Sequence, residues 1–440
     1  MKQKLQLFFD KNNIKQTLLN ATFVLFFVTL LCRFGIQLFS TYGYESWPIT
    51  EHLINYQGGF VRRGLLGEIL FFLTKNYNLN IEWTIKIFCL VCFVAVCIFF
   101  VRAFLKKGYS LYILPLCFFL GAHILGNSLW MKRDHLIFLF LITTFWTLNK
   151  IKKSIIKFLI INILVVIALL IHEAFAFFVL PILFLLVFKE YRNKTILQSI
   201  TLSFVFLLPS ICAFLLTLHY HGDMKTAQTI WDSWVAVANL NAAELSKFSH
   251  GAISSIGWTS EWAFKYHFRI NFWTKNMGVV SMFFWSMIIP VVYYIVTNAL
   301  LVFRKNESIF TNKDKTVLSS ILVFQLLCLL PFFLILSCDL GRVIFYWTAS
   351  SFAIFLLMPK EKTENLFPTF FTEFIERINK GLTNILHPTK TTVVLFMIFI
   401  GISDVGFYFR SVIGSSVVFN ILWILSQLLL FLKKIIFIFF

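Results

Sequence analysis

Long apolar runs, separated by short polar segments, fill most of the chain. An α-helix of about 20 apolar residues crosses the hydrocarbon core of a bilayer, whereas an outer-membrane barrel would show short alternating segments. The pattern therefore predicts an all-α polytopic membrane protein with about twelve transmembrane helices, forming one integral membrane domain over residues 1–440. The expected spans are residues 18–39, 83–104, 109–126, 133–148, 155–171, 174–188, 197–218, 277–302, 316–337, 342–358, 391–409 and 412–432.

Composition and charge agree with a membrane protein and give it an orientation. Hydrophobic residues make up 59% of the chain, whereas a soluble protein has about 45–50% apolar residues. With the N-terminus inside, the expected cytoplasmic segments hold 25 of the 39 Lys and Arg residues and 8 of the 20 Asp and Glu residues. This bias follows the positive-inside rule and predicts that both termini are cytoplasmic. The net charge of +19 therefore requires no nucleic-acid partner.

The same orientation assigns each longer polar segment to one side of the membrane. Residues 1–17 form a basic cytoplasmic N-terminus that we expect to act with the first span as a start-transfer anchor. Residues 359–390 form a cytoplasmic loop. Residues 40–82 form the first external loop, and residues 219–276 form a larger external loop.

The first external loop contains an expected amphipathic helix from about residue 63 to residue 75. Its apolar residues repeat at near-helical spacing, which is typical of a helix that lies in the plane of the membrane surface. These apolar residues are Leu65, Leu66, Ile69, Leu70 and Leu73, and the other side carries Gly64, Gly67, Glu68 and Lys75.

Ionisable residues gather at the expected external ends of the spans. Such residues are costly near the membrane and usually mark a site or a pathway, so they predict a cavity of mixed charge at the outer surface. Each group also has a plainer interpretation, as a helix-start ion pair, a headgroup contact or a solvated turn. The residues concerned are Glu45, Glu51, Arg62, Arg63, Lys132, Arg133, Asp134, His135, His172, Glu173, Asp339 and Arg342.

Two adjacent arginines, Arg62 and Arg63, stand in the stretch NYQGGFVRRGLLGEIL, against the charge bias of their loop. Arginine suits phosphate because its planar fork donates two parallel hydrogen bonds and stays charged. Gly58 and Gly59 permit a close backbone approach or a positive φ, so this turn could deliver both arginines to a phosphate group. A carboxylate beside a diphosphate could accept the proton of an incoming sugar hydroxyl.

The larger external loop and the cysteines add little specific chemistry. Five of the twelve tryptophans lie in that loop, where they could stack on sugar rings or form an interfacial aromatic belt. The eight cysteines lie within or beside apolar runs. We therefore expect neither a disulfide framework nor a zinc site.

The layout resembles the multi-spanning glycosyltransferases that use polyprenol-linked donors, the GT-C superfamily in the broad sense, and the O-antigen and capsule polymerases. In GT-C enzymes an acidic residue of the first external loop precedes an interfacial helix, which matches Glu45 or Glu51 here. The Asp134 of MKRDHLIFLFL matches the acid that commonly opens the fourth span. The stretch IHEAFAFFVLP places His172 and Glu173 where a lysine is more usual. The chain departs from that pattern in having only Glu in the first loop and no soluble external domain.

The resemblance implies a bacterial inner-membrane enzyme that acts at the periplasmic face on undecaprenyl-linked glycans, with repeat-unit polymerisation as its expected reaction. Glu45, Glu51 or Asp134 would then be the catalytic base. The diphosphate would be held by Arg62, Arg63 and Arg342. The expected substrate-orienting residues are Lys132, Arg133, His135, His172, Glu173 and Asp339.

The glycosyltransferase hypothesis requires no cofactor and predicts no dedicated metal ligands, although the external acids could bind a divalent cation. The expected partners are the undecaprenyl-linked oligosaccharide and membrane lipid. A complex with other membrane proteins of polysaccharide assembly is also compatible with the resemblance.

Two other functions fit the same sequence. A GT-C enzyme that adds one sugar from a polyprenyl-phosphate donor would use the same residues and differ in product length. A transporter or flippase of lipid-linked oligosaccharide would need a polar path through the membrane, whereas the expected spans here are largely free of charge at their centres.

Overall fold

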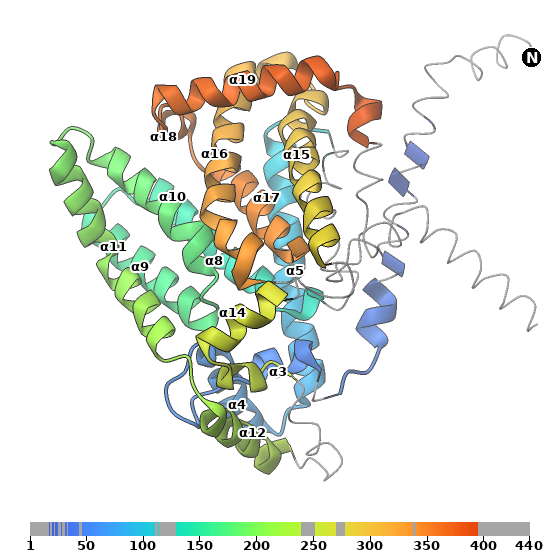
Figure 1. The fold of residues 1–440 in the computed structure, drawn as a ribbon, viewed down its shortest axis with the longest axis vertical. Coiled ribbons are helices and arrows are strands. Elements are labelled where there is room, and N and C mark those ends of the chain that lie inside the picture. The colour runs from blue at the N-terminus through green and yellow to red at the C-terminus, as the bar shows by residue number, and fades with distance from the viewer. Residues whose placement is uncertain are drawn as a thin grey trace, which may run out of the picture.

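The computed structural model describes residues 46–110, 129–238, 251–269, 278–337 and 340–394, together with Ile113 and part of 17–43. These residues form an all-α structure (Figure 1). No strand occurs in the described ranges, where a single isolated bridge joins Tyr109 and Arg304.

The described ranges contain a series of α-helices with a few shorter helical turns between them. Their bounds are α3 (Trp47–Leu53), α4 (Gly64–Tyr77), α5 (Ile81–Lys106), η2 (Leu129–Met131), α8 (Asp134–Lys150), α9 (Ser154–Ile171), α10 (Phe175–Glu190), α11 (Ile196–His219), α12 (Met224–Ala238), η3 (Ser254–Gly257), α14 (Ser260–Phe268), α15 (Gly278–Val302), η5 (Glu307–Ile309), α16 (Asn312–Pro331), η6 (Phe332–Leu336), α17 (Leu340–Leu357), α18 (Lys360–Thr363) and α19 (Thr369–Ile385).

Five helices of the described part are long and apolar enough to cross a membrane, which fits a membrane protein. They are α5, α9, α11, α16 continued by η6, and α17. Expected spans 133–148 and 174–188 correspond to α8 and α10, which have 17 and 16 residues. The expected spans 18–39, 109–126, 391–409 and 412–432 fall partly, largely or wholly outside the described residues. The number twelve therefore stays a prediction.

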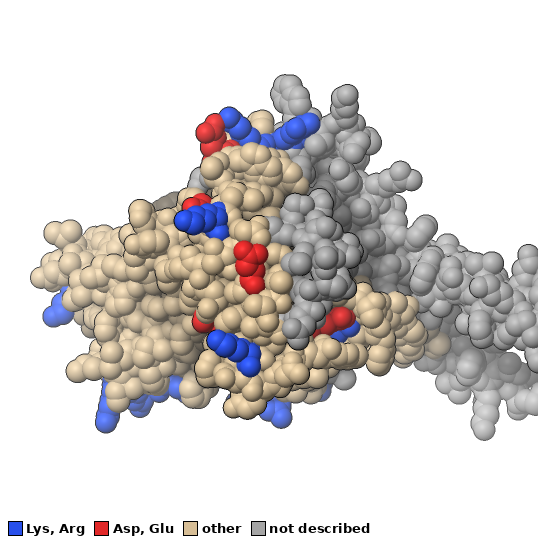
Figure 2. Space-filling model, turned by 90° about the horizontal axis from the view of Figure 1, so that it is seen from below, with Lys and Arg blue, Asp and Glu red and all other residues tan. Residues whose placement is uncertain are grey.

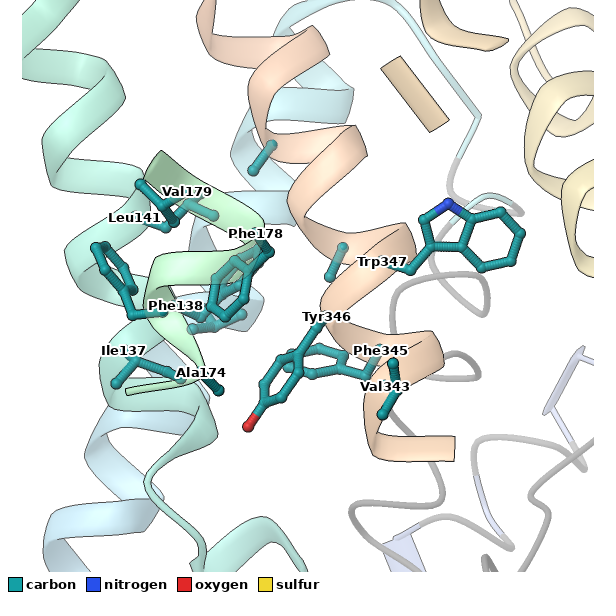
Figure 3. Close-up of a cluster of buried hydrophobic side chains, with 14 of the residues drawn as sticks. Ile137, Phe138, Leu141, Ala174, Phe178, Val179, Val343, Phe345, Tyr346 and Trp347 are labelled. Carbon is teal, nitrogen blue, oxygen red and sulfur yellow. The ribbon is translucent and has the colours of Figure 1, made fainter. Parts of the chain in front are cut away.

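Helix α17 forms the centre of the bundle. Of its apolar window, 94% is buried inside the protein, against 28% for α5, so α17 is surrounded by other helices while α5 keeps a face for lipid. Figure 3 shows side chains of α8, α10 and α17 meeting in one apolar cluster. The indole N–H of Trp347 donates to the Leu322 carbonyl of α16 at 2.7 Å, which fixes the central helix against its neighbour.

Short helices cover both ends of this bundle (Figure 1). Helices α18 and α19 lie at the upper end in that view, and α3, α4 and α12 lie at the lower end. The lower group is the expected external side, because α3 and α4 come from the first external loop. The described structure thus places a helix, Gly64–Tyr77, where the sequence predicts one; its position in the membrane surface stays a prediction.

Helix α4 turns its glycine side towards the protein. Gly64 and Gly67 are buried, while Ile69 is 51% exposed. A side chain at Gly67 would overlap the carbonyl oxygen of Ile54, so the glycine is what lets α4 approach the chain that leaves α3. On the side that the sequence predicts to be apolar, Leu70 is buried, Leu65, Leu66 and Leu73 are half-buried, and Ile69 is exposed.

We expect Gly67→Ala to destabilise the protein by roughly 1–3 kcal/mol, because the added methyl group must displace the backbone at Ile54. The measurement is the thermal unfolding midpoint of the purified protein in detergent. Gly381→Ala in α19 is the matched control, since nothing lies within 4 Å of its added carbon. Equal midpoints for the two variants would show that the α3–α4 contact is not tight.

Candidate functional site

The structure brings charged residues from five segments together beside the central helix. The segments are α3, the turn before α4, the start of α8, the turn between α9 and α10, and the start of α17. The same segments carry most of the site residues expected from the sequence. We call the resulting group the charged cluster; its members are Glu51, Arg62, Arg63, Lys132, Arg133, Asp134, His172, Glu173 and Arg342.

Asp134 and Arg342 form the buried half of the charged cluster. Arg342 Nε lies 2.9 and 2.7 Å from the two Asp134 carboxylate oxygens, and Arg342 Nη2 lies 2.7 Å from Oδ1. The Tyr346 hydroxyl donates to the same Oδ1. Asp134 is 0% exposed. Its carboxylate is therefore fully occupied by side chains from the first two turns of α17.

The second half of the charged cluster is a carboxylate shared between two arginines. Arg63 Nε donates to both Glu173 oxygens, at 3.1 and 2.8 Å, and its Nη2 also contacts Oε1. Arg62 Nη1 lies 3.5 Å from Oε1, at the outer limit of a hydrogen bond. Arg63 itself has a φ of 65°, a left-handed conformation that caps α4 and turns the chain.

Arg133 holds three backbone segments together rather than a carboxylate. Its Nη1 donates to the carbonyl oxygens of Arg63 at 2.6 Å and Ile171 at 2.9 Å. Its Nη2 donates to the carbonyl of Glu51. These contacts give Arg133 a structural role, and its substrate-orienting role stays a prediction.

Glu51 is the carboxylate with the fewest partners. It is 1% exposed, its Oε1 lies 3.4 Å from the Arg133 backbone N–H and 3.6 Å from Arg342 Nη2, and its Oε2 has no hydrogen-bond partner among the described residues. Burial raises the pKa of Glu51, but the charges of Arg342, Lys132 and Arg133 outweigh that effect and hold the pKa below its usual value. The group is therefore ionised with one oxygen unoccupied.

The other ionisable groups show the same competition between burial and charge. Burial opposes ionisation of Glu173, yet the charges of Arg63 and Arg62 keep its pKa well below the usual value. Burial and the charge of Arg63 hold the pKa of His172 well below its usual value, so its imidazole is neutral. Burial lowers the pKa of Arg62, and the adjacent charge of Arg63 opposes its protonation further, against the attraction of Glu173.

His172 links the two halves of the charged cluster. Its Nε2 lies 3.3 Å from Arg342 Nη2, and its Nδ1 lies 3.7 Å from Glu173 Oε2. The backbone N–H of Ala174 lies 3.2 Å from Nδ1. Because a neutral imidazole accepts at one ring nitrogen only, the ring accepts either from Arg342 at Nε2 or from Ala174 at Nδ1. The turn between α9 and α10 thus fixes the orientation of this ring.

His135 and His52 line the apolar side of the charged cluster. His135 packs against the rings of Phe93 and Phe345, with ring centroids 5.1 and 5.8 Å apart, so its contacts are aromatic rather than ionic. His52, which the sequence does not single out, bonds to the Pro48 carbonyl through Nδ1 at 2.9 Å. Its Nε2 lies 3.5 Å from the Cys89 thiol.

Tyr346 joins the charged cluster to the apolar core. Its ring stacks on Phe178 of α10, with centroids 5.0 Å apart and planes 14° apart. Figure 3 shows its hydroxyl pointing away from the apolar side chains of α8 and α10, and that hydroxyl donates to Asp134. The sequence analysis missed this residue because it lies inside an apolar run; its spacing, one helical turn after Arg342, was the only signal.

The charged cluster holds more positive than negative charge. Among the described residues it contains five Lys and Arg side chains and three carboxylates, an excess of two positive charges with neutral histidine. Figure 2 views the molecule from the end with α4 and α12, where most of the visible described surface is uncharged. The charges of the cluster are therefore buried rather than exposed on this face.

Two expected site residues, Glu45 and Asp339, lie outside the described residues. Lys132 is 5% exposed and acts on Glu51 through its charge. In the described part of the chain, no three His, Cys, Asp or Glu side chains are grouped so that they could hold a metal ion. Each of the three carboxylates of the charged cluster instead faces arginine.

We expect Arg133→Lys to destabilise the protein by roughly 3 kcal/mol or more, because one ammonium group cannot reach three carbonyls in different directions. The measurement is the thermal unfolding midpoint in detergent, with the exposed Arg192→Lys as the matched control. An unchanged midpoint for Arg133→Lys would refute the structural role.

Stability should fall as the pH is lowered from about 6.5 to about 4. Burial lowers the pKa of His52 from 6.5 to about 4, so the unfolded chain binds a proton in this window that the folded chain refuses. The effect of His52 amounts to at most about 3 kcal/mol. His52→Gln should flatten part of the slope of unfolding midpoint against pH; His172 adds a slope of the same sign. An identical slope in the variant would mean that His52 is not buried as a neutral ring.

Comparison with known proteins leaves the function to be inferred from this geometry. No family model, no curated protein and no solved structure matches the chain.

Proposed function

We propose that this chain is a bacterial inner-membrane glycosyltransferase that acts at the periplasmic face on glycans linked to undecaprenyl diphosphate, and that its reaction is polymerisation of O-antigen or capsule repeat units. One observation carries the proposal. A buried group of arginine, lysine and carboxylate side chains with excess positive charge lies beside long apolar helices. A lipid-linked diphosphate has the complementary form, because its tail needs the membrane and its head needs cations.

The arginine pair is suited to the phosphate groups. Arg62 and Arg63 retain 26% and 19% side-chain exposure, more than Arg342 at 11%, so they are the cations most open to an incoming ligand. A diester of diphosphate carries two negative charges and a phosphodiester carries one. The excess of two positive charges among the described residues therefore favours a diphosphate donor. These arginines would also stabilise the charge that develops on the leaving diphosphate.

Glu51 is the best-placed acceptor of a proton from the sugar hydroxyl. Asp134 is occupied by Arg342 and Tyr346, whereas Glu51 Oε2 has no partner in the described structure. A carboxylate with a lowered pKa is a weak base. An anionic ligand would offset the charges of Arg342 and Arg133, so the pKa of Glu51 would rise when the donor binds. The base would thus become active only in the substrate complex.

We expect the surface-polysaccharide ladder to disappear when the gene is deleted from its bacterium, leaving a single capped repeat unit. The Arg62→Ala, Arg63→Ala double variant should fail to restore the ladder, with a loss of transfer rate on the order of 100-fold or more. Glu51→Gln should fail likewise. The measurement is a gel of extracted polysaccharide, with membrane level checked by immunoblot.

The matched control is the Arg192→Ala, Lys194→Ala double variant, which removes two exposed cations from the turn between α10 and α11 and should restore the ladder fully. A ladder whose step size shifts would indicate the alternative function, addition of a single sugar from a polyprenyl-phosphate donor. An unchanged ladder in the deletion strain would refute the proposal.

A further inference from the structure

We propose that Glu173 is an internal stand-in for a phosphate group of the ligand: it occupies the Arg62–Arg63 pair while no anion is bound and leaves that pair when the ligand enters. This inference rests on the proposed function in assigning a diphosphate to those arginines. It adds that the protein itself competes with the ligand for them, and that Glu173 thereby sets the ligand affinity.

The first support is the geometry of the arginine pair. Glu173 presents both oxygens to Arg63 Nε, at 3.1 and 2.8 Å, and one oxygen to Arg62 Nη1 at 3.5 Å. Two oxygens against a guanidinium fork is also the way in which arginine binds phosphate. The carboxylate therefore fills the position that a phosphate would take, and both cannot be there at once.

The second support is that positive charge exceeds negative charge where Glu173 meets the arginine pair. Two arginines share one carboxylate, and Arg62 lies at the outer limit of hydrogen-bond distance. A ligand with more negative charge and more acceptor oxygens would satisfy both guanidinium groups. In the other half of the charged cluster, Asp134 is fully buried and held by Arg342 and Tyr346, so it offers no comparable exchange.

The third support is that the arginines are positioned without Glu173. The Arg62 backbone N–H donates to the Tyr220 carbonyl at 2.9 Å, and the Arg63 carbonyl accepts from Arg133 at 2.6 Å. The helix α4 begins directly after them and is anchored by its buried glycines. Departure of Glu173 would therefore require rotation of its side chain, while the arginine pair keeps its backbone position.

The test measures binding of inorganic pyrophosphate to the full chain in nanodiscs by isothermal titration calorimetry. We expect Glu173→Gln to bind pyrophosphate about tenfold more tightly than the unmodified protein, because the competing charge is gone. Glu190→Gln is the matched control. Glu190 is also a carboxylate shared by two cations, Lys157 at 2.9 Å and Lys362 at 2.7 Å, and its loss should leave the affinity unchanged.

A double-variant cycle separates exchange from simple charge repulsion. In an Arg63→Gln background, Glu173→Gln should no longer tighten binding, since there is no fork left to release. Equal tightening in both backgrounds would overturn the stand-in role, because it would show only long-range repulsion. Unchanged or weaker binding in Glu173→Gln alone would also overturn it.

Failure of the proposed function has a different signature. If the Arg62→Gln, Arg63→Gln double variant binds pyrophosphate as tightly as the unmodified protein, the arginines do not hold phosphate and the proposed function loses its basis. If that variant loses binding while Glu173→Gln binds no more tightly, only the stand-in role is refuted. Unfolding midpoints of all variants identify any that misfold, and the cycle can then be repeated with Arg63→Lys.

Discussion

One guanidinium group determines whether the charged cluster can exist. Arg133 donates to carbonyl oxygens of Glu51, Arg63 and Ile171, and so ties together α3, the turn before α4 and the end of α9. Buried carbonyls need donors, and a buried arginine needs acceptors. Because the two terminal nitrogens of Arg133 bond to carbonyls at Glu51, Arg63 and Ile171, these three segments are held at fixed positions around it, and each contributes side chains to the charged cluster.

The other residues of the site are positioned where the apolar core of the bundle meets the charged cluster. Helix α17 is almost fully enclosed, and its first two turns carry Arg342 and Tyr346 to the end of the bundle. Tyr346 belongs to both sides of the boundary, with its ring stacked on Phe178 and its hydroxyl bonded to Asp134. Packing of the core thereby fixes the positions of the charged side chains at the start of α17, which a flexible loop would not do.

The two halves of the charged cluster differ in a way that matters for binding. Asp134 and Arg342 are held in place by burial and by the hydrogen bond from Tyr346 to Asp134, so this half of the charged cluster is fixed. Arg62, Arg63 and Glu173 are more exposed and unequally matched. Burying excess positive charge is costly unless an anion offsets it. The positive excess among the described residues is the physical basis for proposing that the site takes a negatively charged ligand, a lipid-linked diphosphate.

The sequence by itself determined the helical class and the candidate charged residues, and its apolar runs include the five helices of the described part that are long enough to cross a membrane. These follow from local properties, since hydropathy is additive along a run and a charged residue in an apolar chain stands out wherever it lies. It also predicted the helix at Gly64–Tyr77. The expected number of spans and the positions of Glu45 and Asp339 concern residues beyond those described.

Only the tertiary structure decided which charges meet and what each one does. The sequence assigns Arg62 and Arg342 to a diphosphate and Arg133 to substrate orientation. Their partners in the structure are Glu173 in the turn before α10, the buried Asp134, and three backbone carbonyls, respectively. The sequence does not single out Tyr346, because the residue lies in an apolar run and its hydrogen-bond partner, Asp134, belongs to another helix. The role of an ionisable side chain depends on which atoms surround it, and those atoms come from segments that only packing of the helices brings within hydrogen-bond distance.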